Sequence, residues 1–124
     1  VELEELVGPP GLNGSYEYTL STGEDALRLG FVQIDPAGEV YQMRWLEPRT
    51  GRLRLGVAIR IGDMLVASYS EKDQVGVVAY CVASDWLVGI GASPTRRTLS
   101  RQTMVRPGKS LPTSLATLPG TCPE

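Results

Sequence analysis

Residues 53–69, LRLGVAIRIGDMLVASY, decide the fold of this 124-residue chain. Two runs in which apolar side chains occupy every second position flank Gly62-Asp63, which is typical of a two-residue hairpin turn with glycine first. This turn sets Ile59 opposite Val66, so apolar residues meet across the hairpin. The stretch therefore predicts a pair of antiparallel β-strands.

The same alternation continues on both sides of this hairpin, and no helix of three turns is evident after residue 13. Strand patterns occur at SYEYTL (15–20), LRLGFVQI (27–34), VYQMRWL (40–46), LRLGVAIRI (53–61), MLVASY (64–69), VGVVAYCV (75–82) and WLVGIG (86–91), with an eighth within 97–105. Short strands without a covering helix must close on themselves or form two layers. We predict an all-β antiparallel meander of about seven or eight strands that forms a barrel or strongly curved sheet.

A second turn helps to select the face of the sheet that forms the core. Residues 35–39, DPAGE, predict a three-residue loop in which Gly38 is left-handed, and this loop sets Phe31 opposite Met43. The predicted core face consists of Leu27, Leu29, Phe31, Tyr41, Met43, Trp45, Leu53, Leu55, Val57, Ile59, Ile61, Met64, Val66, Val75, Val77, Ala79 and Cys81.

Composition indicates one folded domain. The chain is 42% hydrophobic and 21% charged, and its apolar runs are far shorter than the roughly 20 residues of a membrane-spanning helix, so we expect no transmembrane segment. The breaks at Gly8-Pro9-Pro10-Gly11 and in the Pro-rich end divide the chain into a lead-in segment (1–13), a β-barrel-like domain (14–106) and a C-terminal tail (107–124).

Charge is unevenly distributed along the chain. Residues 1–85 hold 13 acids and 7 bases, a balance of −6, whereas residues 86–123 hold five bases and no acid, a balance of +5. An anionic partner is one explanation, and docking of the basic segment 96–109 on the domain's own acidic surface is the other. Because residues 92–124 contain no aromatic side chain, we favour the second explanation and expect no nucleic-acid partner.

The two cysteines predict a compartment. A Cys81–Cys122 disulfide would tie the tail to the sheet, which is typical of an oxidising environment, and two free thiols are the alternative. We therefore expect an exported protein, whether periplasmic, at the cell envelope or secreted. The chain begins at Val1 without a basic and apolar signal segment, so an exported protein would be represented here by its mature form.

Several chemistries have no residues to carry them. The chain contains no histidine, no cluster with metal-ligand spacing and no phosphate loop before a helix, so we expect no metal and no cofactor. Carboxylates are the remaining catalytic candidates, but most of them fall in predicted turns, where aspartate commonly bonds to the backbone. These candidates are Asp35, Glu39, Asp63, Glu71, Asp73 and Asp85.

Two sets of side chains are candidates for binding. Arg28, Arg44, Arg54 and Arg60 fall on one predicted outer face, as an anion-binding patch or as ordinary solvated charges. Phe31, Tyr41, Met43 and Trp45 are candidates for lining a pocket for an apolar ligand, although an eight-stranded barrel is commonly filled by its own side chains.

The order Gly14-x-Tyr16, Tyr41-x-x-x-Trp45, 55–59 (LGVAI), Gly62-Asp63-x-Leu65-Val66 and Gly76-Val77-Val78-x-Tyr80 resembles a group of small exported bacterial β-domains, some of which are loosely labelled fibronectin-binding. The resemblance covers about residues 14–91 and implies a glycine-marked meander, with no catalytic residue to carry over. The last hairpin departs from the family pattern, because Tyr80-Cys81-Val82 leads to Ser84-Asp85-Trp86.

Three functions follow from these observations. The first is a non-enzymatic exported module that binds an unknown macromolecule or has a structural role. The second is a carrier with a barrel cavity for a small apolar ligand. The third is a carboxylate-based hydrolase, which requires two carboxylates facing each other across one cleft. Oligomeric state is not encoded in any pattern of the sequence.

Overall fold

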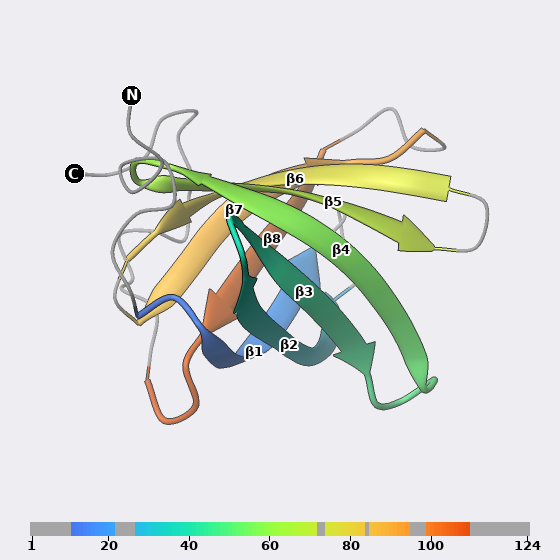
Figure 1. The fold of residues 1–124 in the computed structure, drawn as a ribbon. Helices are drawn as coiled ribbons and strands as arrows, with labels where there is room; N and C mark the ends of the chain where they lie inside the picture. The colour runs from blue at the N-terminus through green and yellow to red at the C-terminus, as the bar shows by residue number, and fades with distance from the viewer. Residues whose placement is uncertain (1–10, 22–26, 72–73, 84, 95–98, 110–124) are drawn as a thin grey trace.

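The computed structural model describes residues 11–21, 27–71, 74–83, 85–94 and 99–109 (Figure 1). Within these ranges, side chains are not described at 21, 27–29, 71 and 74. The strands are β1 (Gly14–Ser21), β2 (Leu27–Ala37), β3 (Val40–Glu47), β4 (Arg52–Ile61), β5 (Met64–Glu71), β6 (Gln74–Val82), β7 (Trp86–Ala92) and β8 (Ser100–Val105).

The eight strands pair in chain order, each antiparallel to the next, and β8 pairs with β1 to close the barrel. In Figure 1, β4, β5 and β6 run across the top of the molecule, and β1, β2 and β3 run below them. The predicted all-β meander is therefore confirmed. Closure leaves no strand edge free along the ring, which protects such a sheet from pairing with other chains.

The barrel interior is packed with large side chains. Tyr16, Ile34, Leu65, Tyr80 and Met104 are each almost completely buried, and Leu12 joins the same cluster from the segment before β1. The remaining members of the core are Tyr18, Leu20, Val32, Tyr41, Met43, Trp45, Ala58, Ala67, Val78 and Leu87.

The predicted core face is right on β3 and wrong on β2, β4, β5 and β6. Tyr41, Met43 and Trp45 point into the barrel as predicted. Phe31, by contrast, is 51% exposed. The other large side chains of the predicted core that lie in the solvent are Leu53, Leu55, Val57, Ile59, Ile61, Met64, Val75 and Val77.

The turn between β2 and β3 explains the error on β2. Strand β2 continues through Pro36 to Ala37, which pairs with Val40 across a two-residue turn with Gly38 at a φ of 65°. Phe31 consequently lies opposite Leu46 rather than Met43. This displacement is three residues, an odd number, so it moves the opposite set of β2 side chains into the core.

The hairpin at Gly62-Asp63 has the predicted register, with Ile59 opposite Val66, but both residues face outward. The inward positions of β4 are occupied instead by arginines, Gly56 and Ala58. A Cβ atom at Gly56 would meet the Ser68 carbonyl and lie 2.8 Å from Trp45 Cζ3. Small residues on β4 therefore leave room for the large aromatic side chain of β3 inside a ring of fixed width.

Candidate functional site

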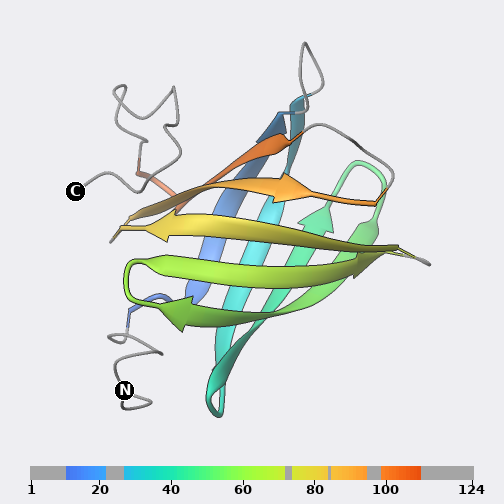
Figure 2. The ribbon, with the colours of Figure 1, turned by 90° about the horizontal axis from the view of Figure 1, so that it is seen from above.

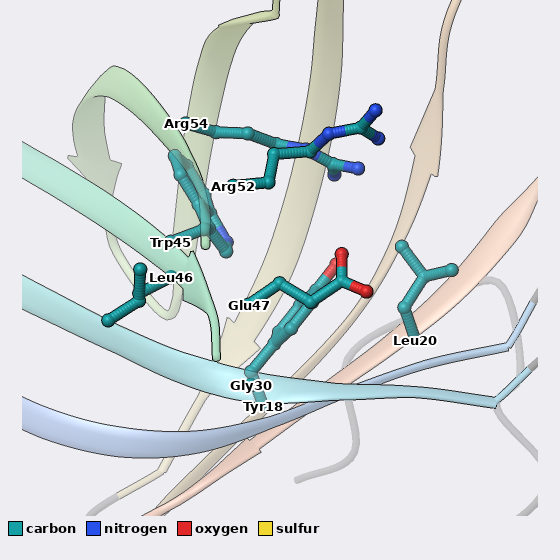
Figure 3. Close-up of a pocket in the computed structure, with 8 residues that line it drawn as sticks. All are labelled: Tyr18, Leu20, Gly30, Trp45, Leu46, Glu47, Arg52 and Arg54. Carbon is teal, nitrogen blue, oxygen red and sulfur yellow. The ribbon is translucent and has the colours of Figure 1, made fainter. Parts of the chain in front are cut away.

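A pocket opens at the end of the barrel where β1 and β3 finish and β2 and β4 begin (Figure 3). It holds about 330 Å³ of empty space, open solvent included, but the centre of a water molecule can occupy only about 20 Å³ of it. This is space for roughly one ordered water. The lining residues are Tyr18, Leu20, Gly30, Trp45, Leu46, Glu47, Arg52 and Arg54.

Aromatic and charged groups meet in this pocket. The ring of Trp45 lies 5.7 Å from that of Tyr69 at an angle of 59°, and the Arg54 guanidinium lies 5.5 Å from the centre of the same Tyr69 ring. Arg52 and Arg54 extend in the same direction from β4, and Glu47 enters from β3, where it is opposite Arg52 in the register (Figure 3). Both arginines have interaction partners in the protein. These contacts support the barrel mouth itself.

The structure does not bring together the residues predicted to line a cavity for an apolar ligand. Phe31 is on the outside of the barrel, whereas Tyr41 and Met43 are packed in the core. Only Trp45 of this set lines the pocket. This pocket has space for little more than water, and the core cluster occupies the described part of the barrel interior.

The predicted arginine patch does not lie on one outer face. Arg44 is on the exterior and forms an ion pair with Asp35 at 3.1 Å. Arg54 points into the pocket at one end, and Arg60 is buried toward the other end, where its Nε donates to the Gly62 carbonyl at 2.9 Å. Arg28 is in β2, but its side chain is outside the described part. The error on β4 has the same cause as the misplaced core, because its arginines occupy inward positions.

The other end of the barrel is closed by polar contacts around Tyr16. The Tyr16 hydroxyl donates to the Leu12 carbonyl at 2.6 Å, and the Arg106 guanidinium lies 4.7 Å from the centre of the Tyr16 ring. Arg106 also donates to the carbonyls of Gly11 and Asn13. Burial raises the pKa of Tyr16 above its ordinary value, although Arg106 opposes this shift. The start of the described chain is thereby fixed over this end.

A buried polar pair lies inside the barrel wall. The Tyr80 hydroxyl donates to Gln102 Oε1 at 2.6 Å, and Gln102 Nε2 donates to Ser100 Oγ at 3.4 Å. Burial raises the pKa of Tyr80 well above its ordinary value, so this hydroxyl remains protonated and acts as a donor. The pair satisfies groups that would otherwise be unpaired in the core, which is a structural role.

Three of the carboxylate candidates take part in contacts of the fold, and a fourth, Glu39, is exposed in the turn between β2 and β3. Asp35 pairs with Arg44, and the backbone carbonyls of Asp63 and Asp85 accept from the amides of Val82 and Arg106 at 2.8 and 2.9 Å. Asp73 lies outside the described residues, as does the side chain of Glu71. Cys122, the predicted disulfide partner of Cys81, also lies outside them. Within the described part, no group of three or more His, Cys, Asp or Glu side chains has the arrangement of a metal site.

The outer surface of β4, β5 and β6 is the feature that sequence reasoning missed. We call it the β4–β6 outer face. Across the strands, Ile59 lies beside Val66, which lies beside Ala79, and this row continues to Ile90 on β7. No described segment covers these strands when the molecule is viewed from above (Figure 2). The large exposed side chains of the face are Leu53, Leu55, Val57, Ile59, Ile61, Met64, Val75 and Val77.

Comparison with protein-family models, curated proteins and solved structures finds no match for this chain. Among the described residues, no helix has the length and apolar character needed to cross a membrane.

Proposed function

We propose that the protein is a non-enzymatic exported module that works by binding a macromolecule through the β4–β6 outer face. The observation that carries this proposal is the exposure of eight large aliphatic side chains on three adjacent strands. Scattered exposed aliphatic residues are ordinary, but a continuous apolar patch of this kind is typical of an interaction surface.

The size of the patch supports the same function. A fully exposed aliphatic residue presents roughly 190 Å², so eight such residues at about half exposure present about 750 Å². The largest apolar patch of an ordinary monomer is about 300–600 Å².

The export part of the proposal depends on the predicted Cys81–Cys122 disulfide. The mass of the intact protein before and after reduction tests this disulfide, because reduction adds two hydrogen atoms.

A photo-reactive side chain tests the proposed surface directly. We would introduce it at Val57, in the middle of the outward positions of β4, and separately at Thr103, an outward position of β8 on the other side of the ring. Illumination in the cells that produce the protein should give a covalent adduct from position 57 and much less from position 103. No adduct from position 57, or equal yields from both positions, would overturn the proposed function.

A further inference from the structure

We propose that the partner on the β4–β6 outer face is a second copy of this chain, in a dimer with two-fold symmetry. This inference rests on the proposed function, because it names the occupant of the same surface. Such a dimer would place the outer faces of two barrels against each other as two aligned layers of strands, a common way for β-sheets to bury apolar side chains.

The area of the face matches one half of a stable interface. Its eight large side chains present about 750 Å², whereas an interface of standard size buries about 800 Å² on each partner. Both copies contribute the same patch in a two-fold interface, so one patch of this size is sufficient on each chain. Figure 2 shows β4, β5 and β6, coloured green to yellow, lying side by side, which gives a surface that a second layer can cover.

The charge of the face also favours a second copy. Among the outward positions of β4, β5 and β6 whose side chains are described, every residue is apolar or is a serine, and none is charged. A face with charge of one sign would repel its own copy, and a face that recognises a charged partner would need the opposite sign. A neutral face meets neither problem when it packs against itself.

The rows across the sheet show how regular this surface is. Ile61 lies beside Met64, and Val57 lies beside Ser68, which lies beside Val77. The two serines, Ser68 and Ser70, occupy one half of the central strand β5, and Met64 and Val66 occupy the other half. The larger side chains of β4 and β6 therefore flank a short depression at the serines, into which an apolar side chain of another copy can pack.

Association through this face would stop at two copies. In the closed ring of eight strands, β4 and β8 are four strands apart in either direction, and β5 and β1 are likewise opposite. The outward positions on that opposite side include Glu17 and Arg101, both exposed. Four large apolar side chains outside the face, Phe31, Leu46, Ile90 and Leu99, are also exposed, so a two-fold contact covers eight of the twelve large exposed apolar side chains among the described residues.

Sedimentation velocity of the purified full chain tests this inference. We expect a species with twice the 13.4 kDa chain mass at micromolar concentration. Val57→Lys places a charge in the middle of the contact on both copies and should raise the dissociation constant at least about a hundredfold. Thr103→Lys adds the same charge to β8 and should leave the dimer intact. Circular dichroism establishes that each variant is folded, and Leu55→Lys replaces Val57→Lys if that variant does not fold.

Each outcome of these experiments has a definite meaning. A dimer lost in Val57→Lys and retained in Thr103→Lys supports the inference. A wild-type monomer at all concentrations, or a dimer unaffected by Val57→Lys, overturns it, as does a monomer that binds vesicles of phosphatidylcholine. If the photo-adduct from position 57 is a different protein, the proposed function stands and the second copy is excluded. If position 57 gives no adduct, both fail.

Discussion

The assignment of inside and outside on β6 predicts very different effects for the same substitution at two adjacent residues. Val77 is 54% exposed and Val78 is 2% exposed. Changing either residue to alanine removes two methyl-sized groups from the same strand, β6. Since the change in chemistry and in strand propensity is matched, the difference between the two variants reports the side of the barrel wall on which each residue lies.

The magnitude for Val78→Ala has two parts. Loss of two buried carbon groups at about 0.8 kcal/mol each lowers the free energy of unfolding by about 1.6 kcal/mol. A void of roughly 40 Å³ left inside a closed barrel adds about 1 kcal/mol. We therefore expect Val78→Ala to lower the free energy of unfolding by about 2.5 kcal/mol, and Val77→Ala, which leaves no cavity and loses only partial burial, by about 0.7 kcal/mol.

Urea unfolding followed by tryptophan fluorescence measures both values. With a slope of about 1.5 kcal/mol per molar urea, the midpoint should fall by about 1.7 M for Val78→Ala and by about 0.5 M for Val77→Ala. The experiment is made at high dilution, so that association through the outer face does not contribute to the effect of Val77. Equal shifts in dilute protein, or a larger shift for Val77→Ala, would refute the assigned faces.

Three further predictions concern the interior of the barrel. Tyr80→Phe leaves the buried Gln102 oxygen without its donor and should lower the free energy of unfolding by about 1–3 kcal/mol. Combining Tyr80→Phe with Gln102→Leu should recover part of this loss. A double variant less stable than the single variant would contradict the prediction. Gly89→Ala brings a Cβ atom onto the Ala79 carbonyl and to 2.8 Å from the Tyr80 ring. Calorimetry should therefore find the free energy of unfolding lowered by about 1–3 kcal/mol. An unchanged melting temperature would contradict this packing. Unfolded tyrosines lose their proton near pH 10, whereas burial raises the pKa of Tyr16 and, more strongly, the pKa of Tyr80 in the folded protein. The folded state therefore binds more protons, and stability must fall as pH rises above about 10. Absorbance at the phenolate band should show Tyr80 ionising only with unfolding, and ionisation of all five tyrosines without loss of structure would exclude its burial.

The sequence was sufficient for the strands, their order and one hairpin register. Turn residues such as Gly62-Asp63 act locally, so the pairing of Ile59 with Val66 can be predicted without knowledge of the rest of the fold. The eight-stranded meander follows from strands that have no helix to cover them.

The face of the core was not predictable from alternation alone. On β4 and β6 the side chains of the two faces differ in size. The rule that the larger apolar residues are buried selects the wrong face of these strands as the core. The decisive quantity is the volume inside a closed ring, because Trp45 and Tyr80 already fill it and leave space only for small residues at Gly56 and Gly89. The matching of large aromatic residues with glycine on a neighbouring strand was the available signal.

The candidate site depended on the same choice of face. Once Ile59 and its neighbours are taken to be core, no exposed apolar surface remains to suggest a partner. The arginines were misplaced for the same reason, because Arg54 and Arg60 occupy inward positions at the two ends of β4. Only the β3 aromatic residues kept their predicted position, since β3 alternates large apolar with polar side chains.

NMR of the isoleucine methyl groups tests whether the β4–β6 outer face is exposed, because the chain contains only Ile34, Ile59, Ile61 and Ile90. The Val57→Lys variant, selectively labelled at these methyl groups, is examined by NMR with a soluble paramagnetic agent that broadens exposed signals. The structure predicts strong broadening of Ile59, Ile61 and Ile90, and a protected signal from Ile34. Protected signals from Ile59 and Ile61 in the monomeric variant, with a broadened signal from Ile34, would contradict an apolar outer face on β4–β6.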